Sequence, residues 1–204
     1  MKDAEALCKL GDNLYLCFTD LLFDITMKVS GACNTSVIET LIKADYFSEF
    51  GSAGKLLKVF SEFTGGKMKI YKSLCLATIE KRLSWLADYE ATLPEEEIPP
   101  VQLIPFEIDK FGTPIHTYPD KQDCYAVVEV DTKYSPKVRL YNLATGNIGQ
   151  MKILKATYKK QPLKAGDIFR LDTWQKKPAY QYVDGKPKAK PGVYDLWLNA
   201  YTKL

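Results

Sequence analysis

The sequence predicts an α+β chain in which an all-helical first part precedes a small five-stranded β-barrel. Three observations predict it. Apolar residues recur at helical spacing through the first part, prolines crowd the middle, and short runs typical of strands fill the last part. The predicted organisation is a helical domain over residues 1–92, a proline-rich linker over 93–119 and a barrel domain over 120–204.

The first two predicted helices are amphipathic. In FTDLLFDITMKV, which begins at Phe18, large apolar residues fall on one face, and Thr19 or Asp20 is expected to cap the start. NTSVIETLIKA follows, with Asn34 or Thr35 as the expected cap. The two segments together predict a packed helical pair.

A third amphipathic segment, SAGKLLKVFSEF, opens at Ser52 and is ended by Gly65 and Gly66. The run KMKIYKSLCLATIEKRLSWLADYEATL then predicts a longer helical stretch in one or two pieces. The stretch PEEEIPPVQLIP comes next. Because proline removes a donor and blocks helix continuation, we expect an extended linker from about Leu93 to Phe106, with its three glutamates in solvent.

The last part predicts short strands joined by turns. CYAVVEV is rich in β-branched residues, and KVRLYNL alternates Val138 and Leu140 with Arg139 and Tyr141. ATGN predicts a hairpin turn, after which IGQMKIL returns. Further strands are expected after the turn AGD and in VYDLWLNAY, with DG marking another turn. Five short strands in about 80 residues are typical of a small Greek-key barrel, of which the OB fold is a common example.

Charge divides the chain as sharply as the predicted fold does. The net charge is +3, but residues 1–100 hold 11 basic and 15 acidic side chains, whereas residues 101–204 hold 17 and 10. The basic excess is greatest from Val130 to Lys190, with 14 basic and 4 acidic residues. Such a skew predicts a polyanionic partner for the second half.

Several functional classes are disfavoured by composition. The cysteines are Cys8, Cys17, Cys33, Cys75 and Cys124. Their odd number and the lack of a CxxC pair favour free, buried thiols in a reducing compartment. Since His116 is the only histidine, a zinc site or a histidine-based nucleophilic enzyme is not expected. We expect no cofactor, no metal and no catalytic residue. Lacking a signal peptide or an apolar run of spanning length, the chain is expected in the cytoplasm without a membrane partner.

Basic and aromatic residues are interleaved along the predicted barrel. Basic groups neutralise phosphates and aromatic faces stack on unpaired bases, so the combination predicts a surface for single-stranded DNA. The candidate DNA-binding residues are Lys133, Tyr134, Lys137, Arg139, Tyr141, Lys152, Lys155, Lys159, Lys160, Arg170, Trp174, Lys176, Lys177 and Tyr180. Two alternatives stay open: the rings fill the barrel beneath a solvated lysine surface, or KKPAYQYVDGKPKAKPG is a disordered basic loop.

Two other patterns carry weaker signals. Glu129 and Asp131 fall on one face of a predicted strand, as two-metal phosphoryl transfer would need, although an ordinary strand end is the favoured interpretation. QLIPF, from Gln102 to Phe106, could fill a hydrophobic groove in extended form or could simply pack on the barrel domain. No phosphate-binding loop is present, since the glycines before Lys55 have the wrong spacing.

The segment from Phe18 to Gly51 resembles the helix-hairpin-helix region of the bacterial replicative DNA polymerase III alpha subunit. In that family a phenylalanine-led helix precedes an asparagine-started helix that reads VIExLIKAGAFDSFG, and this chain reads VIETLIKADYFSEFG after Asn34. Asp45 replaces the family's glycine. Because glycine takes the left-handed conformation easily, we expect the hairpin to differ at Asp45.

The order of helices, linker and barrel also fits the family, and DTKYSPKVRLYNLATG and PLKAGDI resemble its OB domain in phages and related bacterial elements. The resemblance implies the C-terminal part of such a polymerase. Its OB barrel would hold single-stranded template, and its helices would pack on the remainder of the polymerase and contact duplex backbone. The catalytic aspartates of the palm are absent from this chain, so the resemblance does not imply polymerisation by the chain alone.

In the same family the linker carries a peptide that binds the sliding clamp. QLIPF resembles it at Gln102, Leu103 and Phe106, with Pro105 in place of the usual leucine, which implies clamp binding by these three residues. Three rival hypotheses remain: a stand-alone single-strand-binding or recombination protein, a small nuclease that uses Glu129 and Asp131, and a structural adaptor whose barrel binds protein.

Overall fold

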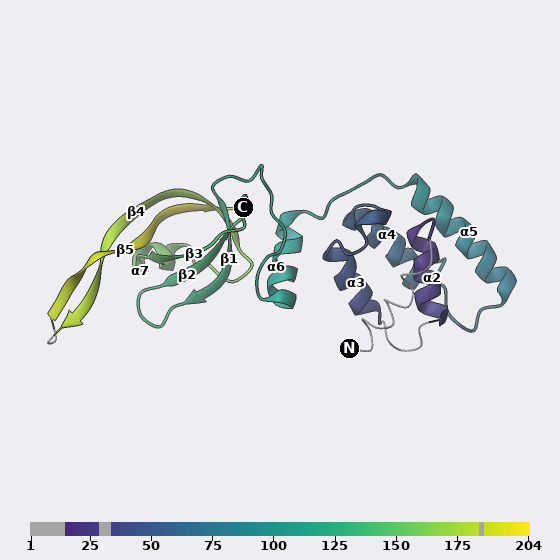
Figure 1. The fold of residues 1–204 in the computed structure, drawn as a ribbon, viewed down its shortest axis with the longest axis horizontal. Helices are drawn as coiled ribbons and strands as arrows, with labels where there is room; N and C mark the ends of the chain where they lie inside the picture. Colours follow the sequence, from purple (N-terminus) through teal and green to yellow (C-terminus); the bar gives the residue numbers. More distant parts are fainter. Residues whose placement is uncertain (1–14, 29–33, 184–185) are drawn as a thin grey trace. The chain divides into compact units, whose positions relative to one another are not determined.

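The computed structural model describes residues 15–28, 34–183 and 186–204 and has mixed α+β structure (Figure 1). It divides into two compact units, Met1–Ile98 and Pro99–Leu204, which are considered separately below. The first unit is helical. Its described elements are α2 (Phe18–Lys28), α3 (Thr35–Lys43), the 3-10 helix η1 (Ser48–Phe50), α4 (Ala53–Thr64) and α5 (Leu76–Thr92).

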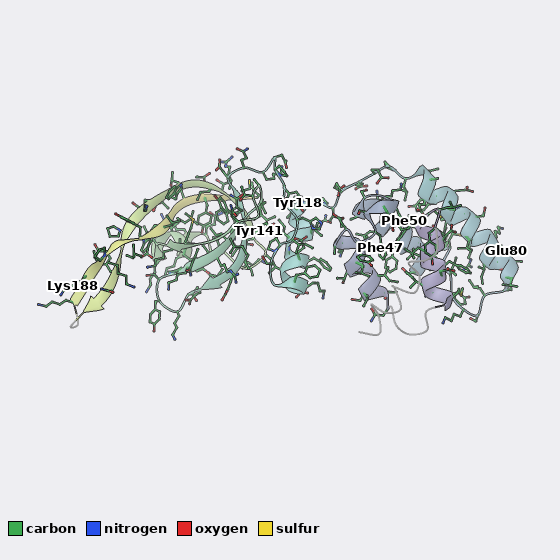
Figure 2. All side chains as sticks on the ribbon, in the orientation of Figure 1. Phe47, Phe50, Glu80, Tyr118, Tyr141 and Lys188 are labelled. Carbon is green, nitrogen blue, oxygen red and sulfur yellow. The ribbon has the colours of Figure 1, made fainter. Side chains whose placement is uncertain are left out.

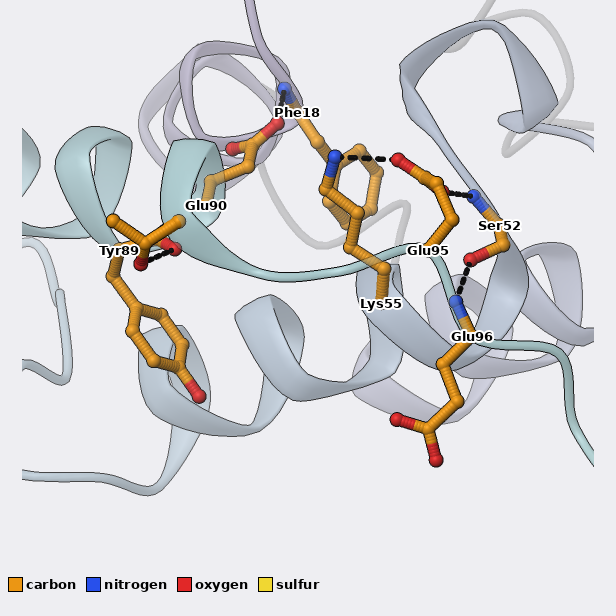
Figure 3. A network of polar contacts seen from close by, with 8 residues as sticks. Phe18, Ser52, Lys55, Tyr89, Glu90, Glu95 and Glu96 are labelled. Atoms are coloured by element: carbon orange, nitrogen blue, oxygen red, sulfur yellow. Dashed lines mark hydrogen bonds and ion pairs between the residues drawn. The ribbon is translucent and has the colours of Figure 1, made fainter.

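The start of α2 is held by a buried carboxylate from α5. Glu90 accepts a hydrogen bond from the Phe18 N–H at 2.7 Å (Figure 3). It also accepts from the Thr19 N–H at 2.9 Å and from the Thr19 hydroxyl at 2.7 Å. The first backbone N–H groups of a helix have no hydrogen-bond acceptor within the helix. They also form the positive end of the helix dipole, which favours a nearby anion. The predicted capping by Thr19 or Asp20 is therefore wrong, because Glu90 supplies the cap from a distant helix.

The corner after α3 keeps the left-handed turn despite its aspartate. Asn34 caps α3 as predicted, accepting from the Val37 N–H at 2.9 Å. At the other end Asp45 has φ of 57°, the Tyr46 N–H bonds the Leu41 carbonyl and the Asp45 N–H bonds the Ile42 carbonyl. These bonds form a Schellman motif, which usually has glycine at this position. The expected departure of the hairpin at Asp45 is thus not seen in the backbone.

Aromatic rings fix this corner to α2. The centroid of the Phe18 ring lies 5.3 Å from that of Phe47 and 5.9 Å from that of Phe50. Phe18 and Phe47 are both buried. Figure 2 shows Phe47 and Phe50 beside one another. Tyr46 is exposed and only its edge contact with Phe47 ties it to the cluster. Burying two such phenylalanine rings contributes about 4 kcal/mol to the stability of the corner.

The stretch predicted as a free linker begins inside the helical unit. Glu95 accepts from the Ser52 N–H at 2.6 Å and from Lys55 Nζ at 2.7 Å, and the Glu96 N–H donates to the Ser52 hydroxyl at 2.7 Å (Figure 3). At Gly54 an added Cβ would lie 2.2 Å from the Glu96 carbonyl oxygen, so only glycine allows this crossing. The predicted start of a free linker at residue 93 is corrected accordingly, whereas the side chains of Glu95 and Glu96 are exposed to solvent as expected.

Two further expectations need correction. The long predicted helical run before residue 93 is helical only as α5, and the residues from Lys67 to Cys75 are irregular. Among the three cysteines that the structure describes, Cys124 is buried, Cys17 is half-buried and Cys75 is exposed. Burial raises the pKa of Cys17 to about 11, so this thiol stays protonated near neutral pH.

The second unit opens with a helix where an extended linker was predicted. Helix α6 spans Pro100–Phe111, with Pro100 in its first turn, where proline fits because the missing N–H needs no partner. Pro105 lies inside the helix and removes the N–H that would bond the Val101 carbonyl; Val101 lies on the exposed side. The gain that offsets this loss is burial, since Leu103 and Ile104 are almost fully covered.

Five strands follow α6 and form a closed barrel. They are β1 (Cys124–Asp131), β2 (Lys137–Asn142), β3 (Ile148–Ile153), β4 (Ile168–Val183) and β5 (Lys186–Lys203), and α7 (Lys155–Lys160) lies between β3 and β4. The order around the barrel is β1-β2-β3-β5-β4, with β4 returning to β1. All neighbouring pairs are antiparallel except β3 and β5, which are parallel.

The barrel buries one set of side chains inside and a second set against its outer face. Val127, Val138, Leu140, Ile153, Phe169 and Leu198 belong to the inner cluster. On the outside, Ile104 of α6 packs with Cys124, Ala126, Tyr141, Leu143 and Ile168. Figure 2 shows Tyr118 and Tyr141 where α6 meets the strands. Helix α6 therefore covers one part of the outer face and leaves the rest open.

A buried pair fastens the segment after α6. Glu107 is fully buried and accepts hydrogen bonds from the Ile115 N–H at 3.1 Å and from the His116 ring at Nδ1. The Tyr141 hydroxyl donates to the His116 carbonyl at 3.0 Å. Burial, and secondarily the negative charge of Glu107, raises the pKa of Tyr141, so its hydroxyl stays a donor.

Candidate nucleic-acid interface

The open part of the outer face lies on β1, β2 and β3. In the ladder Glu129 pairs with Arg139, Asp131 with Lys137, and Arg139 with Gln150. Cross-strand partners lie on the same face of a sheet, so these side chains share one surface. They line a hollow of about 430 Å³ together with Ile148 and Gly149.

A β-bulge in β1 makes this surface possible. The register with β2 shifts between Val127 and Glu129. Strict alternation would place Val127 and Glu129 on one face, inside the barrel. The extra residue, Val128, instead packs outward in the cluster beneath α6, and Glu129 then faces outward opposite Arg139. Bulges commonly redirect a side chain beside a functional surface.

Next to this hollow, charged groups surround Trp197 of β5. Lys152 pairs with Trp197 across the β3–β5 ladder, and its Nζ lies 5.8 Å from the ring centroid and 2.5 Å from the Asp195 carboxylate. Lys177 of β4 approaches the same ring, with its Nζ at 4.9 Å. Cation–π contacts at these distances hold the ring in one orientation. Lys152 and Lys177, both predicted, thus lie together on one surface with Trp197.

On the side of Trp197 that leads back to Lys186, β5 pairs only with β4 among the described residues. We call residues 176–183 and 186–196 the arm, and Figure 1 shows it extending past the other strands. Trp174 at its base and Tyr194 on it are each 52% exposed, and Lys176 Nζ lies 4.4 Å from the Tyr194 ring centroid. Large rings left this open can receive a stacked base.

Two more rings are exposed, and a lysine lies beside the first of them. Tyr134, in the loop from β1 to β2, is 70% exposed, and Lys133 Nζ lies 5.6 Å from its ring centroid. The Lys133 N–H donates to Asp131 at 2.9 Å, which orders the start of this loop. On the arm Tyr180 is 63% exposed, and Lys188 lies near the far end (Figure 2). The alternative that segment 176–192 is a disordered loop does not fit its paired strands.

Not every predicted residue belongs to this surface. Tyr141 is buried under α6 and its selection as a DNA-binding residue is wrong, because its outward face of β2 is covered. Lys155, Lys159 and Lys160 are exposed but lie on α7, apart from the strand ladders. Arg170 pairs with Cys124 at the covered end and forms an ion pair with Asp172 at 3.3 Å.

The predicted clamp peptide lies in α6, which changes its geometry. The extended conformation expected for QLIPF is wrong, since all five residues are helical. Gln102 is exposed, Phe106 is half-buried and Leu103 is buried. An extended bound form would require α6 to unfold and Leu103 to leave its contacts. Clamp binding by these residues stays a prediction.

Sequence reasoning missed Tyr194 and Trp197. VYDLWLNAY was interpreted only as the last strand, without separating its two ends, and its later residues are the ones that enter the barrel, where Leu198 is fully buried. The alternation of side chains along the strand could have indicated both rings. Trp197 lies on the same strand face as the Asp195 carboxylate, and Tyr194 lies on the opposite face.

The nuclease alternative finds no metal-ligand cluster. Glu129 and Asp131 each face a cation across the ladder. Within residues 15–28, 34–183 and 186–204, no group of three or more histidine, cysteine, aspartate or glutamate side chains is placed to hold a metal ion.

The same part of the chain contains no helix with the length and apolar character needed to cross a bilayer. Residues 29–33 and the predicted turn at Asp184 and Gly185 lie outside the described residues.

Comparisons with known proteins give no relative for this chain. No protein-family model, no curated protein and no solved structure matches it. Function is therefore argued from the surface itself.

Proposed function

We propose that the second unit is an OB-type domain that binds single-stranded DNA. The strand order β1-β2-β3-β5-β4 and the helix between β3 and β4 support the OB-type assignment. One observation carries the binding proposal. Large rings stand open to solvent with lysines directly over them, at Tyr134 with Lys133 and at Tyr194 with Lys176. Stacking and phosphate neutralisation need this combination.

The covering of the barrel supports the location of the site. Helix α6 occupies one part of the outer face, so a strand of DNA has access to the remainder: the hollow on β1, β2 and β3, the Trp197 region and the arm. Figure 1 shows the loop from β1 to β2 and the arm on the side of the barrel away from α6. The exposed rings of Tyr134, Trp174, Tyr180 and Tyr194 would each stack on a base, worth about 1–3 kcal/mol apiece.

We further propose that the chain serves as the C-terminal DNA-binding region of a replicative DNA polymerase III alpha subunit. The proposal rests on the resemblance of residues 18–51 and on the order of the two units. The left-handed Asp45 supports it, since the family has glycine there. In this setting the remainder of the polymerase and the sliding clamp would be partners. A polymerase palm encoded in the same reading frame or in a cotranscribed gene would support the assignment, and an isolated reading frame with neither would contradict it.

Binding is tested by fluorescence anisotropy of a labelled single-stranded oligothymidylate across a salt series. We expect log affinity to fall linearly with log salt, with a slope of about −0.7 for each phosphate neutralised. Absent or salt-independent binding would contradict the proposal. Tyr194→Ala should weaken binding about tenfold through loss of one stacked base. Trp85→Ala, which removes a half-exposed ring from the helical unit, is the matched control and should leave the affinity unchanged.

The charges are tested by a pair of matched double variants. Lys176→Ala with Lys177→Ala removes two cations beside the rings of Tyr194 and Trp197, whereas Lys159→Ala with Lys160→Ala removes two cations from α7. The first double variant should reduce the magnitude of the salt slope by about 1.4, and the second should change it little. Equal effects would mean that general charge, and not this surface, attracts the DNA.

A further inference from the structure

We propose that the hollow on β1, β2 and β3 preferentially holds a guanine base of the bound strand. This inference rests on the proposed single-strand binding and adds to it the base that is recognised. It follows from the way the hollow combines a carboxylate, a guanidinium and an amide beside an apolar wall, in the part of the face that α6 leaves open.

The carboxylate of Glu129 is the feature that a plain phosphate-binding surface does not explain. A negative group repels phosphates, yet the bulge turns it outward into the basic face. Glu129 and Arg139 are ladder partners, but no ion pair within 4 Å joins them, and the Glu129 carboxylate makes no hydrogen bond within the described part of the chain. Asp131 differs, because it already accepts the Lys133 N–H. Glu129 is thus the acceptor left for a ligand.

The neighbouring groups complete a recognition edge. Arg139 lies directly opposite Glu129, and Gln150 lies directly opposite Arg139 on the other side. Ile148, which is nearly half exposed, gives the hollow an apolar wall. A flat base can rest against such a wall while its edge meets the polar row. Unstacked bases in single strands are commonly recognised in this way, through their Watson–Crick edges.

Guanine matches this row better than the other bases. Its Watson–Crick edge presents two adjacent donors, at N1 and N2, and one acceptor, O6. The two oxygens of Glu129 can accept both donors, while Arg139 donates to O6. Cytosine and adenine each offer only one amino donor on that edge, so they leave one carboxylate oxygen unpaired. Thymine places a carbonyl on each side of its single N–H, and both carbonyls would face the carboxylate.

The test uses a 12-residue oligothymidylate carrying one central substitution, with anisotropy as the readout. The wild-type chain should bind the dG oligonucleotide about tenfold more tightly than the all-thymine one. The corresponding hypoxanthine oligonucleotide, which lacks the N2 amino group, should fall between them. Glu129→Gln keeps the size of the side chain but loses one acceptor; it should bind dG and thymine oligonucleotides about equally, with no loss of affinity for thymine.

Each outcome separates the two proposals. Glu80→Gln is the control, since Glu80 is exposed on the helical unit, and it should retain the full dG preference. Equal wild-type binding to all bases, a preference for dC, or a dG preference that survives Glu129→Gln would overturn the guanine assignment and leave single-strand binding intact. No binding to any oligonucleotide would overturn both.

Discussion

Among the described residues each unit buries one glutamate, and the two glutamates differ in the donors that they meet. In the helical unit Glu90 joins α5 to the start of α2, 72 residues earlier in the chain. Its three donors are two backbone N–H groups and a hydroxyl. In the barrel unit Glu107 joins α6 to the segment that follows it, and one of its two donors is the ring of His116.

The difference shows two ways to keep a buried carboxylate satisfied. Glu90 is a helix cap contributed by another helix, so two of its three partners are backbone groups that change little with side-chain substitution. Glu107 depends on the side chain of His116, which is itself partly exposed. Burying a carboxylate without hydrogen-bond donors would cost several kcal/mol. Donors offset this cost in both cases, but those of Glu90 are less easily lost by substitution than those of Glu107.

The largest expected effect tests the backbone-capped glutamate. Glu90→Ala leaves the Phe18 N–H, the Thr19 N–H and the Thr19 hydroxyl buried without their acceptor, so it should lower the free energy of unfolding of the helical unit by about 3 kcal/mol. Urea unfolding followed by Trp85 fluorescence, with both barrel tryptophans changed to Phe, measures it. Glu80→Gln on exposed α5 surface is the control. A loss below 1 kcal/mol would mean that water replaces the cap.

The side-chain-dependent glutamate should show a smaller loss and a rescue. His116→Ala removes one donor from Glu107 and should destabilise the barrel unit by about 2 kcal/mol, because a buried charge loses a partner. Adding Glu107→Gln to this variant removes the charge and should restore part of the stability. Trp174 and Trp197 fluorescence in a Trp85→Phe background reports on this unit. Strictly additive losses in the two variants would contradict the pairing.

The next effect returns to the helical unit and to Asp45. Asp45→Gly and Asp45→Ala both remove the carboxylate, so their difference isolates the cost of a left-handed backbone. We expect the glycine variant to be more stable than the alanine variant by about 1 kcal/mol, since alanine is strained at a φ of 57°. Thermal unfolding of the two proteins side by side measures this. Equal stabilities would show that the turn relaxes on substitution.

The smallest effect concerns Glu95, which is exposed but, like the two buried glutamates, accepts hydrogen bonds from a backbone N–H and a side chain. Lys55, and then the Ser52 N–H, lowers the pKa of Glu95 from 4.5 to about 2. A lowered folded-state pKa stabilises the unit above pH 4.5, and this contribution is lost as the pH falls from 4.5 to 2. Glu95→Gln should therefore reduce the acid sensitivity of the helical unit in this range. Glu97→Gln is the control, and an equal reduction there would refute the Ser52–Glu95 contact.

Much of the fold could be predicted because local pattern and final burial agree. Val138 and Leu140 alternate with polar neighbours and are buried inside the barrel, and Asn34 caps its own helix. Helix α6 could not be predicted from local pattern, since its prolines argue against a helix. Its stability comes from burial of Leu103, Ile104 and Glu107 against a barrel that lies later in the sequence.

The candidate site was predicted in part for a similar reason. Lysines and aromatic residues mark the basic barrel, but the sequence cannot tell which ring a later helix will cover, so Tyr141 was chosen and Trp197 was not. The direction of Glu129 depends on a one-residue bulge, and such a bulge reverses the face of every residue after it. The local sequence VVEV is compatible both with a bulged strand and with a regular strand, so it does not indicate which way Glu129 faces.

The arm has one more consequence, for behaviour at high concentration. Its two strands leave unpaired backbone groups along both edges, which normally invite another chain to add a strand and begin an aggregate. Five of the six residues from Lys186 to Pro191 are lysine or proline, and Pro178 lies on the facing strand. Proline offers no donor at an edge, and like charges keep copies apart. The composition that suits the arm to a polyanion therefore also protects it against self-assembly.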